Sequence, residues 1–409
     1  MRHCIFWDQP VNIRSGRPTG YLAHLLLGLR NLNQNDIQIW LQETGQTQSH
    51  NSPPALTATE PTQEDIDTEV QGHINFFSNP NHFFFSDSEF ERLLANDTRS
   101  VHLHTYSQVL RTRQTFTAKG ITGIPIMFTS HSPESNAKEL ADSYRVKGAN
   151  PTLTDQLEMT ARNIEELCFK AADIWIFPSR EAMEPYFQTI PEFENWSINK
   201  DIRFVTTGAR APDVSTSKEG LKHKYNIERK KVITFMGRHN SVKGYDLFCK
   251  LALSLLEVRD DIAVIVAGPE SPSLPSPKHP YWLELGWFDK PGDLLTVSDV
   301  FVLPNRMTFY DLVLIEAISL QTVVLASATG GNKSVHDLTN GAVALYNNTS
   351  KGMRENLVSL LDDKGRKVRE IKRKLEGTYE TYFAPDVFAQ NYANLIYQIW
   401  DDYNLGERG

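Results

Sequence analysis

The chain has 409 residues, a length that predicts two or three domains rather than a single core. Hydrophobic residues make up 40% and charged residues 22%, as in globular proteins that fold in water. The formal net charge of -8 argues against a nucleic-acid partner, because phosphate backbones are bound by basic surfaces. Cys4, Cys168 and Cys249 are far apart and show no CxxC spacing, so we expect neither disulfides nor a zinc site.

The N-terminus MRHCIFWDQP contains no apolar segment of signal-peptide length. No stretch approaches the roughly 20 apolar residues that a membrane-spanning helix needs. We therefore expect a cytoplasmic protein, and peripheral attachment to the inner face of a membrane stays open. The sequence does not reveal the oligomeric state.

Short apolar segments alternate with helical patterns along almost the whole chain. In the first half the predicted strands are His3–Trp7, Ile37–Leu41, Val101–Leu103, Ile124–Phe128, Ile174–Phe177 and Phe204–Thr206. In the second half they are Val232–Met236, Ala263–Ala267, Val300–Leu303, Val323–Ala326 and Ala342–Leu345. Continuous apolar runs such as AVIVA are typical of parallel strands buried on both faces. Their alternation with helices predicts doubly wound α/β sheets.

The pattern restarts near residue 230, after a polar stretch around Pro212–Lys218. We therefore expect one Rossmann-like domain over residues 1–215 and a second over residues 216–384. Ligands of such sheets bind at the carboxyl ends of the strands, so the expected site lies in a cleft between the two sheets. An amphipathic helix over Val387–Tyr403, within the segment 385–409, is expected to pack back on the first domain.

The polar segment Thr44 to Gly72 interrupts this pattern. It contains Pro53, Pro54 and Pro61 and shows no clear apolar period. We interpret it as an inserted loop.

A candidate phosphate-binding loop follows the strand KVITFM. The segment GRHNSVKG leads from that strand into a helix predicted over Tyr245–Glu257. Gly237 permits a tight turn, and Arg238 and Lys243 flank the helix N-terminus, which is the positive end of the helix dipole. Arginine can bind two phosphate oxygens at once and lysine adds a point charge, so the pair suits a pyrophosphate. The alternative is a solvated loop with two surface cations.

A second candidate element follows the strand VFVLP. Apolar residues at helical spacing in NRMTFYDLVLIEAISL predict a helix that starts near Asp311, with Glu316 in the middle of the apolar run. A buried carboxylate without donors costs several kcal/mol, and the two adjacent hydroxyls of a ribose would supply donors. The alternative is that Glu316 is exposed or paired with a cation. The peptide N–H groups of Phe309, Tyr310 and Asp311 lie at the helix start, where they suit the phosphates or the sugar of a donor.

These motifs resemble glycosyltransferase family 4. The resemblance rests on GRHNSVKGYDLF, VIVAGP and SDVFVLPNRMTFYDLVLIEAISLQTVVLASATGG, and it is close from about Val232 to Asn332. It is looser in the first domain, where TGYLAHLLLGL, IPIMFTSHSPES and AADIWIFPSREAM look like the family's first helix, its strand-and-His loop and a later strand. The resemblance implies a GT-B fold, a nucleoside-diphosphate sugar as substrate, retention at the anomeric carbon, and no metal or other cofactor.

In the second domain the resemblance assigns roles to five matched positions. Arg238 and Lys243 match the residues that bind the donor pyrophosphate, and Glu316 matches the residue that binds the ribose. Gly286 and Trp287 occupy the loop that usually lies beside the base.

In the first domain two matched positions lie on the donor side. Gly20 matches a glycine whose backbone approaches the donor, and His131 matches the histidine that approaches the donor sugar. The alternative for His131 is an ordinary loop histidine. His102 and His104 end another predicted strand, where lining the acceptor side and a structural role are equally plausible.

The sequence departs from the family at one position. The family's E-x7-E pair ends at Glu316, and its first position is Thr308 here. Losing one such transition-state contact costs on the order of 3 kcal/mol. Enzymes typically gain at least about six powers of ten, so activity can survive that loss. We expect Thr308 or Asp311 to contact a different sugar hydroxyl. The segment also resembles an "FDL" variant in a subgroup of the family for bacterial surface polysaccharides, and this resemblance favours an enzyme.

We therefore predict a metal-independent, retaining glycosyltransferase with a saccharide, lipid-linked or protein-linked acceptor. His131, Arg238 and Lys243 are the predicted catalytic residues, and the leaving phosphate itself would take the acceptor's proton. The alternatives are a non-catalytic glycosyltransferase-like subunit and a GT-B epimerase or phosphorylase. The net charge disfavours a DNA glucosyltransferase, and the absence of GxGxxG after the first strand disfavours a dehydrogenase.

Overall fold

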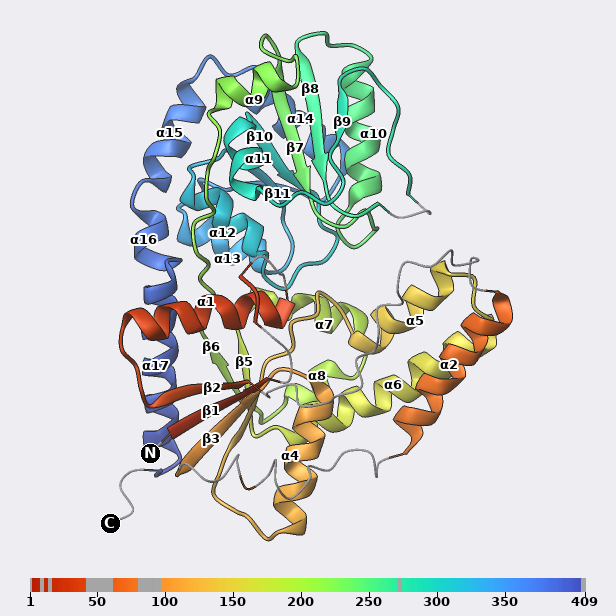
Figure 1. Ribbon diagram of the computed structural model, residues 1–409, viewed down its shortest axis with the longest axis vertical. Coiled ribbons are helices and arrows are strands. Elements are labelled where there is room, and N and C mark those ends of the chain that lie inside the picture. The colour runs from red at the N-terminus through yellow and green to blue at the C-terminus, as the bar shows by residue number, and fades with distance from the viewer. Residues whose placement is uncertain are drawn as a thin grey trace.

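The computed structural model of the protein describes residues 2–7, 11–13, 17–41, 62–79, 91, 97–270 and 274–405. Two sheets of six strands each form the centres of two domains, which lie one above the other in Figure 1. The strand pairings within both sheets are parallel. The expected α/β architecture of two doubly wound sheets is confirmed.

The N-terminal sheet has the strand order β2-β1-β3-β4-β5-β6. Its strands are β1 (Arg2–Trp7), β2 (Ile37–Leu41), β3 (Thr98–Leu103), β4 (Ile126–Phe128), β5 (Ile174–Phe177) and β6 (Asp201–Phe204). The surrounding helices are α1 (Arg17–Asn31), α2 (Gln63–Ser78), α4 (Tyr106–Ala118), α5 (Asn136–Val146), α6 (Pro151–Ala171), the 3-10 turn η2 (Glu181–Met183), α7 (Glu184–Thr189) and α8 (Phe193–Ser197). The residues of β4 and β5 are all buried, because helices cover both faces of the sheet.

The C-terminal sheet has the strand order β12-β11-β10-β7-β8-β9. Its strands are β7 (Lys231–Met236), β8 (Ile262–Ala267), β9 (Trp282–Glu284), β10 (Val300–Leu303), β11 (Val324–Ser327) and β12 (Ala344–Tyr346). Its helices are α9 (Lys218–Lys224), α10 (Tyr245–Leu256), α11 (Pro291–Val297), α12 (Leu312–Ser319), α13 (Gly331–Leu338), α14 (Ser350–Leu361), α15 (Arg366–Leu375) and α16 (Thr378–Tyr382). Every residue of β8 is buried, as its continuous apolar run predicts.

Two strands differ from the sequence-based expectation. The strand expected at Phe204–Thr206 lies earlier, as β6, where it pairs with β5 through Ile174 and Asp201. Strand β9 was not expected, because it is a short edge strand whose residues are only partly apolar and partly buried.

The interpretation of Thr44 to Gly72 as a loop is wrong over its last part. Residues from Gln63 onward form α2, which begins with a capping box between Thr62 and Asp65. Its buried face consists of Ile66, Val70 and Ile74. These apolar side chains are four residues apart, and their burial against α6 stabilises a helix in an otherwise polar segment. Residues 44–61 lie outside the described residues.

Helix α17 (Pro385–Asp402) returns the chain to the N-terminal domain, and α15, α16 and α17 run along one side of both domains (Figure 1). It packs so closely on α1 that a Cβ at Gly28 would lie 2.0 Å from the carbonyl oxygen of Pro385. The hydroxyl of its buried Tyr392 shares hydrogen bonds with His3 Nε2 at 2.8 Å and His102 Nδ1 at 2.6 Å. The structure thus places the last helix in the core of the N-terminal domain.

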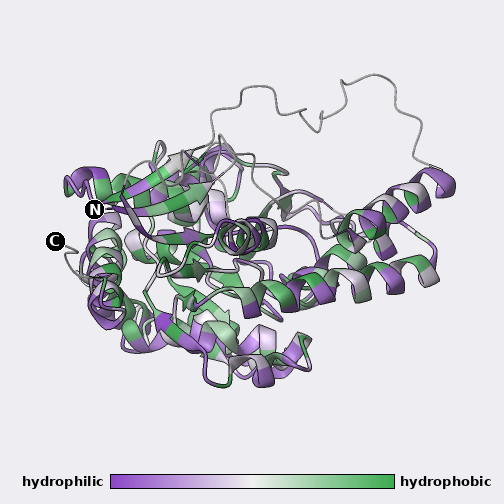
Figure 2. Cartoon of the chain, turned by 90° about the horizontal axis from the view of Figure 1, so that it is seen from below, coloured by the Kyte–Doolittle hydropathy of each residue, from purple (hydrophilic) through white to green (hydrophobic). Residues whose placement is uncertain are grey.

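Helices α2, α5 and α6 extend away from the two sheets in both views (Figures 1 and 2). They are held together by a small apolar cluster that includes Val70, Tyr144 and Leu157. Among the helices of the described ranges, none combines the length and apolar character that crossing a membrane requires.

Candidate functional site

The loop from Gly237 to Gly244 connects β7 to α10 at the carboxyl edge of the C-terminal sheet. The N–H of Gly237 donates to the carbonyl of Ala267, the last residue of β8, at 2.9 Å. Gly244 has φ +67°, and a Cβ there would lie 1.9 Å from the carbonyl oxygen of Pro304, directly after β10. The loop is therefore fitted between the ends of two neighbouring strands, where ligands of such sheets bind.

Arg238 and Lys243 leave this loop toward different carboxylates. The Arg238 guanidinium lies 3.4 Å from Oε1 of Glu139, which belongs to α5 of the N-terminal domain, and its side chain is 46% exposed. The ammonium of Lys243 lies 2.5 Å from Asp311 Oδ1 and is less exposed. The other oxygen of Asp311 accepts a hydrogen bond from Asn305 Nδ2 at 2.5 Å. Lys243 is thus held at the N-terminus of α12, while Arg238 reaches the junction of the domains.

Glu316 lies in the middle of α12 and is partly buried. Burial raises the pKa of its carboxyl from 4.5 to about 7. Within the described residues its carboxylate has no hydrogen-bond donor and no cation partner. The paired alternative for Glu316 is therefore not observed, and the carboxylate is available to accept hydrogen bonds from a ligand.

The segment that leads into α12 is clamped by the start of α13. Thr308 is buried, and a Cβ at Gly330 would lie 1.9 Å from the carbonyl oxygen of Thr308. Phe309 is also buried and packs with aromatic residues of the N-terminal domain, and the partly buried Tyr310 contacts the cores of both domains. The side chain of Asp311 is engaged by Lys243 through Oδ1 and by Asn305 through Oδ2, so both of its oxygens already accept one hydrogen bond.

His131 lies in the loop after β4, at the junction with the C-terminal domain. Its ring contacts Tyr21 of α1 edge-on at 4.8 Å between centroids and Phe309 at 5.9 Å. Its Nε2 shares a 2.9 Å hydrogen bond with Nδ1 of His104. Burial lowers the pKa of His131 to about 3, so the ring is neutral at pH 7. Its Nδ1 has no hydrogen-bond partner among the described residues.

The three remaining candidate positions are Gly20, Gly286 and Trp287. Gly20 is buried in the first turn of α1, directly before Tyr21. Gly286 follows β9 with φ +60°, and its carbonyl accepts from the N–H of Gly268 at 2.7 Å. Trp287 is 75% exposed, so the structure places it on the surface beside this loop rather than against the other candidates.

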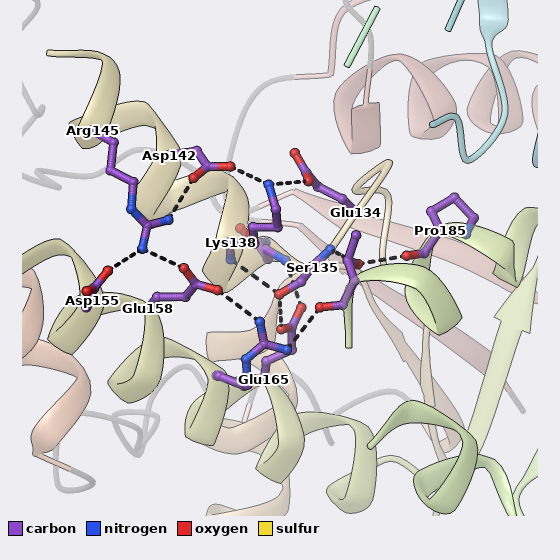
Figure 3. A network of polar contacts seen from close by, with 12 residues as sticks. Glu134, Ser135, Lys138, Asp142, Arg145, Asp155, Glu158, Glu165 and Pro185 are labelled. Atoms are coloured by element: carbon purple, nitrogen blue, oxygen red, sulfur yellow. Dashed lines mark hydrogen bonds and ion pairs between the residues drawn. The ribbon is translucent and has the colours of Figure 1, made fainter. Parts of the chain in front are cut away.

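A polar network around the buried Glu165 holds Ser135 and the start of α5, which follow His131 in the chain (Figure 3). Glu165 of α6 accepts from Ser135 Oγ at 2.6 Å, from the Asn136 N–H at 2.8 Å and from the Tyr106 hydroxyl at 2.8 Å. Burial raises the pKa of Glu165, and these three donors favour its charged form. These bonds anchor the segment after His131, because a buried carboxylate that lost its donors would destabilise the fold.

His102 and His104 are both buried in the N-terminal domain. His102 shares hydrogen bonds with Tyr392 of α17 and with Thr129. Of the two roles left open for His102, these contacts match the structural one. His104 supports His131 through the hydrogen bond between its Nδ1 and Nε2 of His131.

Sequence reasoning missed the groups that join the two domains. Glu139 contacts Arg238, and Glu184 of α7 accepts from the N–H of Gly330 at 2.9 Å and from Lys333 Nζ at 2.8 Å. No local signal marks these residues, because each partner lies far away along the chain.

Comparison with known proteins supports a glycosyltransferase. Residues 230–363 match the family described as glycosyl transferases group 1. Among curated proteins no sequence matches the chain.

Several solved structures share the fold at low sequence identity. Sucrose-phosphate synthase from Thermosynechococcus elongatus is similar with a TM-score of 0.62 and 14% identity, over 98% of this chain and 100% of that chain. The catalytic domain of starch synthase IV from Arabidopsis thaliana, bound to ADP and acarbose, gives a TM-score of 0.63 and 15% identity over 97% and 98%. The Anabaena HepE protein in complex with UDP-glucose gives a TM-score of 0.57 and 14% identity, over 97% of this chain and 100% of that chain. The two-domain architecture is therefore the GT-B fold of glycosyltransferases.

Proposed function

We propose that this protein is a retaining glycosyltransferase that takes a sugar from a nucleoside-diphosphate donor bound between Lys243, Arg238 and Glu316. One observation carries the proposal. Lys243 is held at the N-terminus of α12 by Asp311, the N-cap of this helix, and the unpartnered Glu316 lies five residues after Asp311. Five residues correspond to roughly 7 Å along a helix axis, which suits the distance between the diphosphate and the ribose of one nucleotide.

In this proposal the diphosphate takes the place of two protein carboxylates. Lys243 exchanges Asp311 for phosphate oxygens, and Arg238 exchanges Glu139. Both cations then stabilise the charge that develops on the leaving diphosphate, assisted by the peptide N–H groups at the start of α12. Glu316 accepts from the ribose hydroxyls, and Nδ1 of His131 orients the donor sugar.

The transfer step in this proposal uses no metal ion and no protein nucleophile. The leaving phosphate takes the acceptor's proton on the face that the sugar leaves, so the configuration at the anomeric carbon is retained. The acceptor is a saccharide or a lipid-linked or protein-linked glycan, as in bacterial surface polysaccharide synthesis. That the HepE structure contains UDP-glucose and the starch synthase structure contains ADP supports a nucleotide-sugar donor here as well.

A non-catalytic glycosyltransferase-like subunit is the second candidate. Thr308 favours it, because this buried side chain stands where the resembling family has a sugar-binding carboxylate. Such a subunit would retain nucleotide binding without sugar release.

The test combines binding with turnover. Nucleoside diphosphates and their sugars are screened by thermal shift, since a ligand at 100 times its Kd stabilises the native state by about 2.7 kcal/mol. Release of the nucleoside diphosphate from the matching sugar is then measured for the wild type and for Lys243→Ala. Lys250→Ala, an exposed change on α10, serves as the control.

We expect one nucleotide class to stabilise the protein, and we expect Lys243→Ala to lose that effect while Lys250→Ala keeps it. Binding without release over a panel of acceptors would favour the non-catalytic subunit. Absence of stabilisation by every nucleotide would reject the proposal.

A further inference from the structure

Three side chains with metal-binding atoms meet beside the Arg238 loop. His239 follows β7, Glu270 follows β8 and Glu284 ends β9, and one ligand atom of each lies within 4.8 Å of the other two. His239 Nε2 is 3.6 Å from Glu284 Oε1. Two ligands of a tetrahedral zinc ion, each about 2.0–2.1 Å from the metal, are roughly 3.4 Å apart. The spacing of this pair is therefore already close to that of two zinc ligands.

Buried atoms in this group lack partners. The side chain of His239 is 0% exposed, and neither of its ring nitrogens has a hydrogen-bond partner in the described part of the chain. Glu284 Oε1 is buried and unpartnered in the same way, whereas its Oε2 accepts from Ser276 Oγ at 2.7 Å. Buried polar atoms in folded proteins are almost always satisfied, so orphaned atoms that converge on one point indicate a shared ligand.

Packing fixes the orientation of the imidazole. The ring of His239 stacks on that of Tyr245, with centroids 3.8 Å apart and planes 10° apart. The Tyr245 hydroxyl shares a 3.0 Å hydrogen bond with Ser276, which also donates to Glu284. The stacked ring is therefore held with its Nε2 3.6 Å from Glu284 Oε1, and a fixed ring orientation of this kind is typical of metal-ligating histidines.

We propose that His239, Glu270 and Glu284 form a binding site for one zinc ion. One imidazole nitrogen and two carboxylates match zinc better than calcium or magnesium, which prefer sets of oxygen ligands. Glu270 is exposed, so it gives the ion a route from solvent and leaves a position for water. The bound ion joins the ends of β7, β8 and β9. It takes no part in the proposed transfer step, and the site stands on its ligand atoms whether or not the protein transfers a sugar.

The sequence did not reveal this set. The expectation of no zinc site rested on the cysteines, and none of these belongs to the group. His239 and Glu270 lie in the loops after β7 and β8, Glu284 ends β9, and the three meet only in the folded domain.

The test titrates the metal-free full chain with zinc chloride by calorimetry. Glu270→Gln is the first variant, because an exposed side chain can be changed without loss of the fold. Glu284→Gln is the second, and the exposed Glu257→Gln on the same domain is the control. We expect one zinc ion per chain for the wild type and for Glu257→Gln, and affinities at least about tenfold weaker for the two site variants.

Two further measurements separate the other outcomes. Cys249→Ser is expected to bind zinc as the wild type does, and loss of binding in this variant would overturn the ligand set. Unchanged zinc affinity in both Glu270→Gln and Glu284→Gln, or no saturable binding by the wild type, would mean that water bridges these groups and would also overturn the proposal. Nucleotide binding is measured with and without zinc, so that failure of the metal site is distinct from failure of the proposed function.

Discussion

Arg238 and Glu139 lie on different domains, and the guanidinium of Arg238 approaches the carboxylate of Glu139 to 3.4 Å. Both side chains retain contact with solvent, so this ion pair by itself contributes at most about 1 kcal/mol. The pair matters for where it holds Arg238: it keeps this cation of the candidate phosphate-binding loop at the surface of the C-terminal domain that meets the N-terminal domain. The diphosphate proposed for this site would replace Glu139 as the partner of Arg238.

The first prediction concerns this pair. Arg238→Ala is expected to lower kcat by about two to three powers of ten, because a contact to the developing charge of the leaving group is lost. Glu139→Gln is expected to change kcat/KM by less than about fivefold, because an exposed ion pair is weak. Thermal midpoints of both variants should match that of the wild type. Equal turnover in Arg238→Ala and the wild type would remove Arg238 from the mechanism.

The second prediction concerns the pH dependence of stability at Glu316. Its pKa of about 7 lies above the ordinary value of 4.5, so at most roughly 3 kcal/mol opposes its ionisation in the folded state, at about 1.36 kcal/mol per pKa unit. Between these two values the folded protein keeps a proton that the unfolded chain has lost. The free energy of unfolding therefore falls as the pH rises from about 4.5 to about 7.

Glu316→Gln removes the titrating carboxyl and with it this fall in the free energy of unfolding. The variant should therefore gain stability relative to the wild type as the pH rises from about 4.5 to about 7. Urea unfolding at several pH values measures the difference. A constant difference between the two proteins would show that Glu316 ionises as it does in water.

The third prediction concerns nucleotide binding at the same carboxylate. Ribose hydroxyls that donate to Glu316 favour its charged form and lower its pKa, so binding near pH 7 should release part of a proton. Calorimetry in buffers with different ionisation enthalpies measures this release. Glu316→Gln should bind the nucleotide more weakly and release no proton, and release of the same size in the variant would place the ribose elsewhere.

The fourth prediction compares two glycines with positive φ in the candidate site. Gly244→Ala should destabilise the C-terminal domain by several kcal/mol, because its Cβ would lie 1.9 Å from the Pro304 carbonyl oxygen in a left-handed conformation. Gly286→Ala has a similar φ but open space around the new Cβ, so about 1 kcal/mol is expected. Thermal unfolding of both variants provides the comparison. Similar losses of stability in the two variants would mean that the backbone near Gly244 shifts and relieves the contact between the new Cβ and the Pro304 carbonyl oxygen.

The fifth prediction concerns the contact between α7 and α13. Glu184→Ala should lower the thermal midpoint more than Lys333→Ala, because it also leaves the N–H of Gly330 without its acceptor. Glu184→Gln can keep that acceptor and should lie between the two. If Glu184→Ala and Lys333→Ala have equal effects, the bond to Gly330 contributes nothing measurable.

The sequence by itself determined the architecture and the position of the loop between β7 and α10, the candidate phosphate-binding loop. Apolar runs such as those of β7 and β8 predict buried parallel strands, because both faces of such strands must be covered. The start of α10 was also predictable, since Gly244 and the apolar period after it are local signals. Local signals failed at β9, a three-residue edge strand that is too short to show a pattern, and at α2, whose buried face is narrow.

Only the tertiary structure decided which side chains face one another. It paired Lys243 with Asp311, brought Phe309 against His131, and left Glu316 without a partner. Sequence periodicity records which face of a strand or helix is buried, but it does not record which residues of distant elements meet there. Those partners are set by the order of the strands and by the way the two domains dock, and this is why candidate residues could be named from the sequence but their contacts could not.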